Sequence, residues 1–354
     1  MTPVDSRTAA FFALLRSGLY ERPLSEEEQA VVSRLQPADW TALVRLARRQ
    51  TVTGLLYRAV NFLPESTALS GDLILDLMAY AGGLERENRR KTAVMEALLA
   101  DYTLAGLHPV VMKGATVAAY YVHPELRYSG DIDLYFPPEE FERACRLIDG
   151  CSKASDGTVH FRRDNVDIDL HDRYFDLHCA AGKLPAVGTP EATVLMLSAH
   201  ILKHAVGAGI GIRQLCDLAM AWQALRRPSA EADIGIKPAA MQEVFRRTGI
   251  LRWNRLLFSF LEDYLGLSDS PLADQRVCSD PLLEVILEGG NFGHFAAART
   301  AALQAGASGE RAATRRRKRN TLSRFIHRLP FSLRYAPRET FATMWNLVRG
   351  NLKK

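Results

Sequence analysis

The spacing of apolar residues divides the chain into helical and extended stretches. Over residues 1–107, apolar side chains recur at helical steps, for example within residues 35–46. Residues 85–105 form a longer amphipathic stretch rich in Ala, Leu, Glu, Arg and Lys, which favour helices. Gly106 follows, and glycine commonly ends a helix. We therefore predict an N-terminal helical region over residues 1–107.

From His108 the pattern shortens into runs with strand character. The first run is apolar and β-branched, and the later ones alternate between polar and apolar residues. The predicted strands are 108–113, 131–136, 159–163 and 166–173. A short turn at Asp164 and Asn165 joins the last two strands. Helices are predicted between the earlier strands, at 114–122 and 139–150.

Helical spacing returns from Thr189 onward, where Thr189 is a suitable N-cap residue. The predicted helices are 189–206, 212–227, 238–266 and 281–288. The predicted fold class is therefore α+β. A helical region (1–107) precedes a small α/β core (108–180), and a C-terminal helical region with a basic tail (181–354) follows.

Composition adds an uneven charge to this picture. The net charge of the 354-residue chain is +5, but residues 311–354 alone carry 13 Lys and Arg against one acid. This basic segment includes RRRKR at 315–319, which is either a nucleic-acid-binding patch or a solvated stretch. Because the charge is confined to the tail, nucleic acid is a possible partner but not the favoured one.

Cysteine usage and hydropathy predict a cytoplasmic protein. The five cysteines contain no CxxC pair, so we expect reduced thiols and no structural zinc site. The N-terminus lacks the basic and apolar regions of a signal peptide. No apolar run approaches the ~18 residues of a membrane-spanning helix, so no membrane span is predicted.

Two carboxylates stand out in the sequence GDIDLYF (130–136). Alternation along a strand places Asp131 and Asp133 on one face, while Ile132 and Leu134 point into a core. No cation lies within the motif to balance the two charges. A divalent cation with oxygen ligands is the simplest group that would neutralise them.

Cationic residues and glycines accompany this acidic pair. Gly114 lies at a predicted strand-to-helix turn, where free N–H groups and the helix dipole favour a phosphate. Gly130 directly precedes the pair and joins Gly114 among the candidate nucleotide-binding residues. Lys113 and Arg127 supply positive charge nearby, although Lys113 could equally pair with an acidic side chain.

A further acid lies on a later predicted strand, VDIDLH (166–171). Asp167 and Asp169 share one face there by the same alternation. His171, two residues on, either orients a neighbour or is a core histidine.

Together these motifs resemble the bacterial uncharacterised nucleotidyltransferase family of the DNA polymerase beta-like superfamily. The similarity rests on VVMKGATVAAYYVHPELRYSGDIDLYF (110–136) and VDIDLH (166–171), with weaker matches at LSAHILKHAV, LCDLAM and GNFG (290–293). It implies a mixed β-sheet core, two Mg²⁺ ions and an NTP as co-substrate. Asp131, Asp133 and Asp169, the acid before Leu-His, would be the catalytic and metal-binding carboxylates.

The resemblance further implies that Lys113, Gly114, Arg127 and Gly130 contact the nucleotide. The expected reaction moves a nucleoside monophosphate from an NTP to a hydroxyl or phosphate of a small-molecule, sugar or peptide acceptor. Relatives tend to accompany natural-product and surface-polysaccharide pathways. The alternatives are a toxin-like enzyme that modifies RNA or protein, and a non-catalytic nucleotide-binding scaffold. His200 and His204 have the i, i+4 spacing of zinc ligands, but a structural role is the commoner one.

Overall fold

The computed structural model describes residues 5–64, 67, 69–148, 152–154, 157–178, 183–206, 209–227, 235–289 and 326–352. The chain forms two compact units. The first, here called the sheet unit, comprises residues 5–48 and 52–175. The second, here called the helical unit, comprises residues 49–51 and the described residues from Asp176 onward. The three-region division expected from the sequence remains a prediction.

The sheet unit begins with five helices, as the apolar spacing predicted. They are α1 (Ser6–Tyr20), α2 (Glu26–Val32), α3 (Pro37–Arg49), α4 (Thr53–Val60) and α5 (Gly71–Leu104). The 34-residue α5 is longer than predicted because it also takes in the apolar stretch before residue 85. Ser70 caps its N-terminus, and Gly106, with φ of +67°, turns the chain away at its end.

A mixed sheet follows, with strand order β1-β2-β5-β4-β3. The strands are β1 (Val110–Val111), β2 (Ile132–Tyr135), β3 (Ser152–Lys153), β4 (Val159–Arg163) and β5 (Val166–His171). Only β2 and β5 pair in parallel; the other neighbours are antiparallel. The α+β class is confirmed, whereas β3 was missed because two polar residues carry no periodic signal.

The helices between the strands are shorter than predicted. They are α6 (Ala115–Ala118), the 3₁₀ turn η1 (Pro124–Leu126) and α7 (Pro138–Arg146). The predicted helix over 114–122 stops at Ala118, because tighter turns replace the α-helical bonds of the next residues. The N–H of Tyr121 bonds to the carbonyl of Ala118, three residues back, and Pro124 then excludes a helical residue before it.

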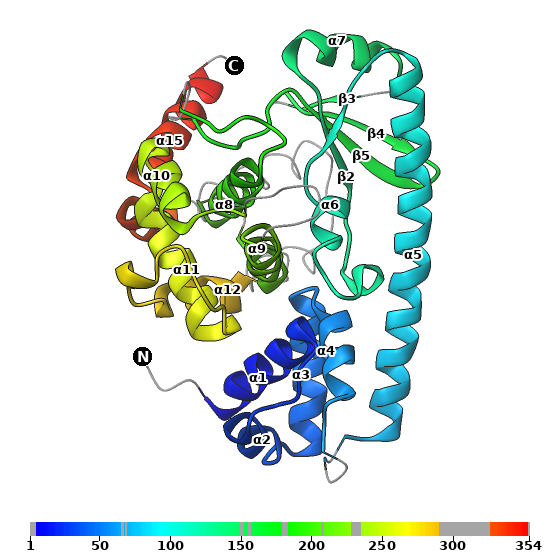
Figure 1. Ribbon diagram of the computed structural model, residues 1–354, viewed down its shortest axis with the longest axis vertical. Helices are drawn as coiled ribbons and strands as arrows, with labels where there is room; N and C mark the ends of the chain where they lie inside the picture. Colours follow the sequence, from blue (N-terminus) through cyan, green and yellow to red (C-terminus); the bar gives the residue numbers. More distant parts are fainter. Residues whose placement is uncertain are drawn as a thin grey trace. The chain divides into compact units, whose positions relative to one another are not determined.

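The two faces of the sheet differ in character. One face packs against the C-terminal half of α5, which runs beside the sheet, and against α7 (Figure 1). Its core includes Tyr102 of α5, whose ring packs edge-on against Phe136 with centroids 4.8 Å apart. Ile132, Leu134, Ile168 and Leu170 cover this face. Alternation places the polar residues of the same strands on the opposite face.

The helical unit contains the helices predicted after residue 188. These are α8 (Pro190–Val206), α9 (Ile212–Leu225), α10 (Pro238–Thr248), α11 (Leu251–Leu265) and α12 (Asp280–Gly289). The 3₁₀ turn η2 (Ala273–Gln275), a helix over 326–335 and α15 (Pro337–Leu352) had no individual prediction. The single stretch expected over 238–266 is two helices, because Gly249 has φ of +82° and breaks it. Among the described helices, none has both the length and the apolarity to cross a membrane.

The close approach of α1 to α4 depends on Gly18. A methyl group at Gly18 would overlap the carbonyl oxygen of Leu55, whereas one at Gly83 of α5 would meet no atom within 4 Å. We expect Gly18→Ala to lower the free energy of unfolding by at least about 1 kcal/mol through overpacking. Gly83→Ala is the matched control and should raise it by about 0.5–1 kcal/mol, because alanine favours the helix. Urea unfolding followed by circular dichroism measures both; equal effects would contradict the close packing.

Candidate active site

The polar face of the sheet brings two carboxylates together across the parallel strand pair. Asp133 of β2 lies in register with Asp169 of β5, and Tyr135 lies in register with His171. In-register residues of neighbouring strands project from the same face. Ligand atoms of Asp133, Asp169 and His171 lie within 4.8 Å of one another, close enough to share a metal ion.

Asp133 is a buried carboxylate with two partners. Only 2% of its side chain is exposed, and its Oδ1 lies 3.0 Å from Lys113 Nζ and 2.8 Å from His171 Nε2. Burial alone would raise the pKa of Asp133, but the Lys113 ammonium and the His171 imidazole outweigh burial and hold it well below its usual value. Asp133 is therefore ionised near neutral pH.

This arrangement corrects one expectation from the sequence. No cation lies within the motif itself, but Lys113, at the end of the segment that contains β1, reaches Asp133 and balances part of its charge. Of the two roles left open for Lys113, the described contact is the pairing with an acid. Its contact with a phosphate remains a prediction.

Asp169 has a partner that the sequence analysis missed. His160 of β4 lies in register with Asp169, and its Nδ1 is 2.5 Å from Asp169 Oδ1. Burial and the charges of Asp131 and Asp133 nevertheless leave the pKa of Asp169 raised, although His160 opposes the shift. Desolvation and the neighbouring carboxylates therefore both disfavour the ionised form of Asp169.

Asp131 does not join the group formed by Asp133, Asp169 and His171. It directly precedes β2, and it is exposed where Asp133 is buried. Its charge still contributes to the raised pKa of Asp169. The structure thus brings two of the three predicted carboxylates together and places the third within electrostatic range.

The choice between Asp167 and Asp169 has a clear geometric basis. Asp167 is 69% exposed and pairs with Arg162 of β4, with Nε and Oδ1 3.0 Å apart. It belongs to no group of potential metal ligands among the described residues. Asp169 is therefore the better candidate for the third carboxylate.

Sequence comparison assigns the chain to a family. A family model described as uncharacterised nucleotidyltransferase matches residues 36–240, more than half of the chain. The chain belongs to this family. Searches of curated proteins and of solved structures found no match. The resemblance to an uncharacterised nucleotidyltransferase family is confirmed, and the general class of the protein is nucleotidyltransferase.

The remaining predicted nucleotide-binding residues of this nucleotidyltransferase chain are Gly114, Gly130 and Arg127. Gly114 has φ of +72°, a backbone conformation that residues with a side chain rarely adopt. A methyl group added at Gly114 would lie 3.7 Å from the carbonyl oxygen of Asp131. A methyl group at Gly130 would meet no atom within 4 Å. Arg127 is only 4% exposed, and its guanidinium donates to the carbonyl of Tyr128 at 3.3 Å. Their contacts with a nucleotide remain predictions.

His200 and His204 of the helical unit have structural partners. Their rings pack edge-on with centroids 4.4 Å apart, and His200 Nδ1 lies 3.3 Å from Asp176 Oδ2. Burial would raise the pKa of Asp176, but His200 and Lys203 outweigh it and lower the pKa strongly. The described part of the chain gives the two histidines no place in a metal-ligand group.

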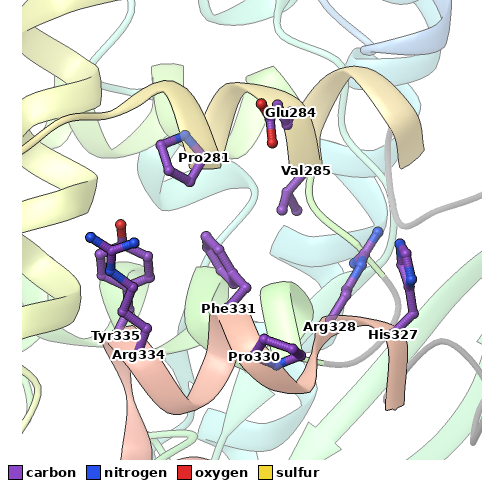
Figure 2. A pocket seen from close by; sticks show the side chains of 9 residues that line it. All are labelled: Pro281, Glu284, Val285, His327, Arg328, Pro330, Phe331, Arg334 and Tyr335. Atoms are coloured by element: carbon purple, nitrogen blue, oxygen red, sulfur yellow. The ribbon is translucent and has the colours of Figure 1, made fainter.

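The helical unit also contains a pocket of about 320 Å³ between α12 and the helix over 326–335. Figure 2 shows Val285 and Phe331 directed into the space between these helices, with Arg328 and His327 at one end. None of the predicted site residues lines it. The GNFG and RRRKR segments lie outside the described residues, as do Cys151 and Cys179; the described Cys145, Cys216 and Cys278 are free thiols.

The charge compensation of Asp133 can be tested with Lys113→Met. Removing the ammonium leaves a buried carboxylate with His171 as its remaining described partner, so we expect the free energy of unfolding at neutral pH to fall by about 1–3 kcal/mol. Because the folded-state pKa of Asp133 is lowered, this deficit should be full above the ordinary value of 3.8 and shrink as the pH falls below it. Urea unfolding at several pH values measures it.

Lys153→Met is the control, because Lys153 is exposed and lies 3.8 Å from Glu142 in a loose surface pair. It should change the free energy of unfolding by less than about 0.5 kcal/mol. Equal losses in the two variants would contradict the compensation of Asp133 by Lys113.

Proposed function

We propose that the protein transfers a nucleoside monophosphate from an NTP to a hydroxyl or phosphate group of a small-molecule, sugar or peptide acceptor, with Mg²⁺ as the cofactor. The observation that carries the proposal is the in-register pair of carboxylates, Asp133 and Asp169, in a chain of this family. Phosphoryl-type transfer needs little beyond positioning and neutralisation of charge, which such a pair provides through bound cations.

The residues present fit a hard divalent cation. The contacts of Lys113 and His171 with Asp133 lie at Oδ1, and a cation would bind this carboxylate through Oδ2. Burial and the charges of Asp131 and Asp133 raise the pKa of Asp169, and a bound cation would offset both effects. Oxygen ligands from carboxylates suit Mg²⁺. When bound, two such ions would neutralise the phosphates and stabilise the attacking and leaving oxygens.

The chain's own residues would divide the work as follows. Lys113 and His171 keep Asp133 ionised and fix its orientation. Asp131, which is exposed, would add its carboxylate to those of Asp133 and Asp169. Asp169, with a raised pKa and held by His160, would orient the acceptor hydroxyl or take its proton. Gly114 and Gly130 would let the triphosphate approach the backbone, and Arg127 would supply positive charge for it.

Asp169→Asn gives a direct test with a matched control on the same strand face. We expect this variant to lose at least about 100-fold in pyrophosphate release from NTP and Mg²⁺, since it removes a charge needed for cation binding. Asp167→Asn removes an exposed acid two residues away and should retain activity within about twofold. Comparable losses in both variants would refute a special role for Asp169.

The choice of acceptor is tested in the same assay by adding total RNA. Pyrophosphate release that does not require RNA supports a small-molecule, sugar or peptide acceptor. Release that requires RNA would instead indicate an RNA-modifying enzyme. Absence of both release and Mg²⁺-dependent NTP binding in the wild-type protein would indicate a non-catalytic scaffold.

A further inference from the structure

Side chains on one face of α5 hydrogen-bond to the backbone of the segment that precedes Asp133. This segment, residues 125–131, connects η1 to β2 and ends at Asp131. Asn88 and Lys91 lie three residues apart on α5 and therefore on one face of the helix. Between them they donate hydrogen bonds to three of its backbone carbonyls, those of Glu125, Arg127 and Ser129.

Lys91 makes the contact closest to the carboxylates. Its Nζ lies 2.6 Å from the carbonyl oxygen of Ser129, two residues before Asp131, and 3.4 Å from Glu87 Oε1. Only 15% of its side chain is exposed. Burial lowers the pKa of Lys91, while the charges of Glu87 and Asp131 oppose the shift. Lys91 thus places a largely buried ammonium between the Glu87 carboxylate and the carbonyl of Ser129, which compensates part of the cost of its burial.

Asn88 holds the earlier part of the segment through its amide nitrogen. Nδ2 lies 2.7 Å from the carbonyl of Glu125 and 2.8 Å from that of Arg127. The other end of the amide, Oδ1, is buried and has no hydrogen-bond partner among the described residues. The two carbonyl acceptors therefore dictate the orientation of the amide, since the flipped form would place Oδ1 against both of them.

We propose that Lys91 and Asn88 are positioning residues that hold the 125–131 segment so that Asp131 stays beside Asp133 and Asp169. The proposal rests on the proposed function, in which these carboxylates bind divalent cations. Unlike Asp133, Asp131 lies outside the strand pairing that would otherwise fix it. Contacts from α5 supply the constraint that the sheet does not.

The sign of one measurement separates positioning from a purely electrostatic role. If Lys91 acted only as a nearby positive charge, its removal would make the acidic group more negative and tighten cation binding. If it positions Asp131, its removal should weaken cation binding in spite of the more negative potential.

The experiment measures Mn²⁺ affinity without nucleotide, by titration calorimetry or by electron paramagnetic resonance of the free ion. Lys91→Met should raise the dissociation constant about 10-fold, the order expected for groups that support metal ligands. Lys91→Arg keeps a donor for Ser129 and should recover most of the affinity. Asn88→Asp places an acceptor against two carbonyls and should also weaken binding. Arg89→Met is the control, because Arg89 is 75% exposed on the same helix, and it should leave affinity within twofold.

A double-mutant cycle ties the effect to Asp131. In an Asp131→Asn background, Lys91→Met should have little further effect, because the carboxylate that it positions is gone. Unchanged or tighter Mn²⁺ binding in Lys91→Met would overturn the proposal, as would its full effect in the Asp131→Asn background. Circular dichroism and the melting temperature of each variant establish that it is folded.

The outcomes distinguish this inference from the proposed function. Wild-type protein that binds Mn²⁺ but releases no pyrophosphate from any NTP would contradict the proposed reaction and leave the positioning result intact. Wild-type protein that releases pyrophosphate, with Mn²⁺ affinity insensitive to Lys91→Met, would overturn the positioning role alone. Wild-type protein that binds no Mn²⁺ would overturn the positioning role, and it would overturn the proposed reaction as well if it also released no pyrophosphate.

Discussion

The buried charge of Asp133 is the constraint on which the site depends. Ionising a carboxylate that is only 2% exposed costs free energy of desolvation. Lys113 and His171 offset this cost because both lie within hydrogen-bonding distance of the carboxylate. Lys113 follows β1 and His171 ends β5, so the two contacts tie the strands on either side of β2 to one oxygen atom. The contacts of Asp133 therefore require this order of the strands.

Much of this site follows from period-two alternation. The motifs at 131–136 and 166–171 place their acids opposite their apolar residues, and the structure confirms the apolar core face. His160 could also have been found. A two-residue turn at Asp164 and Asn165 sets the β4–β5 register, and counting back from it pairs His160 with Asp169.

Other features of the site could not be predicted from local sequence patterns. The parallel pairing of β2 with β5 joins residues 36 positions apart in sequence, as Asp133 and Asp169 show, and no turn between them sets the register. The exposure of Asp131 depends on β2 beginning one residue later than the alternation suggests. The contacts of Lys91 and Asn88 come from a helix whose sequence has no motif that points to the 125–131 segment.

The continuity of α5 has a consequence for how its sequence can vary. An α-helix turns about 100° per residue, since it has 3.6 residues per turn. One residue inserted or deleted between Lys91 and Val94 would turn Asn88 and Lys91 away from the chain they hold, relative to the sheet-facing stripe that includes Val94 and Tyr102. Exposed positions such as Arg89 can change freely, yet the number of residues between Lys91 and the sheet-facing stripe of this 34-residue helix cannot. The number of residues in this part of α5 therefore determines the direction in which Asn88 and Lys91 point, and with it the support of the segment that ends at Asp131.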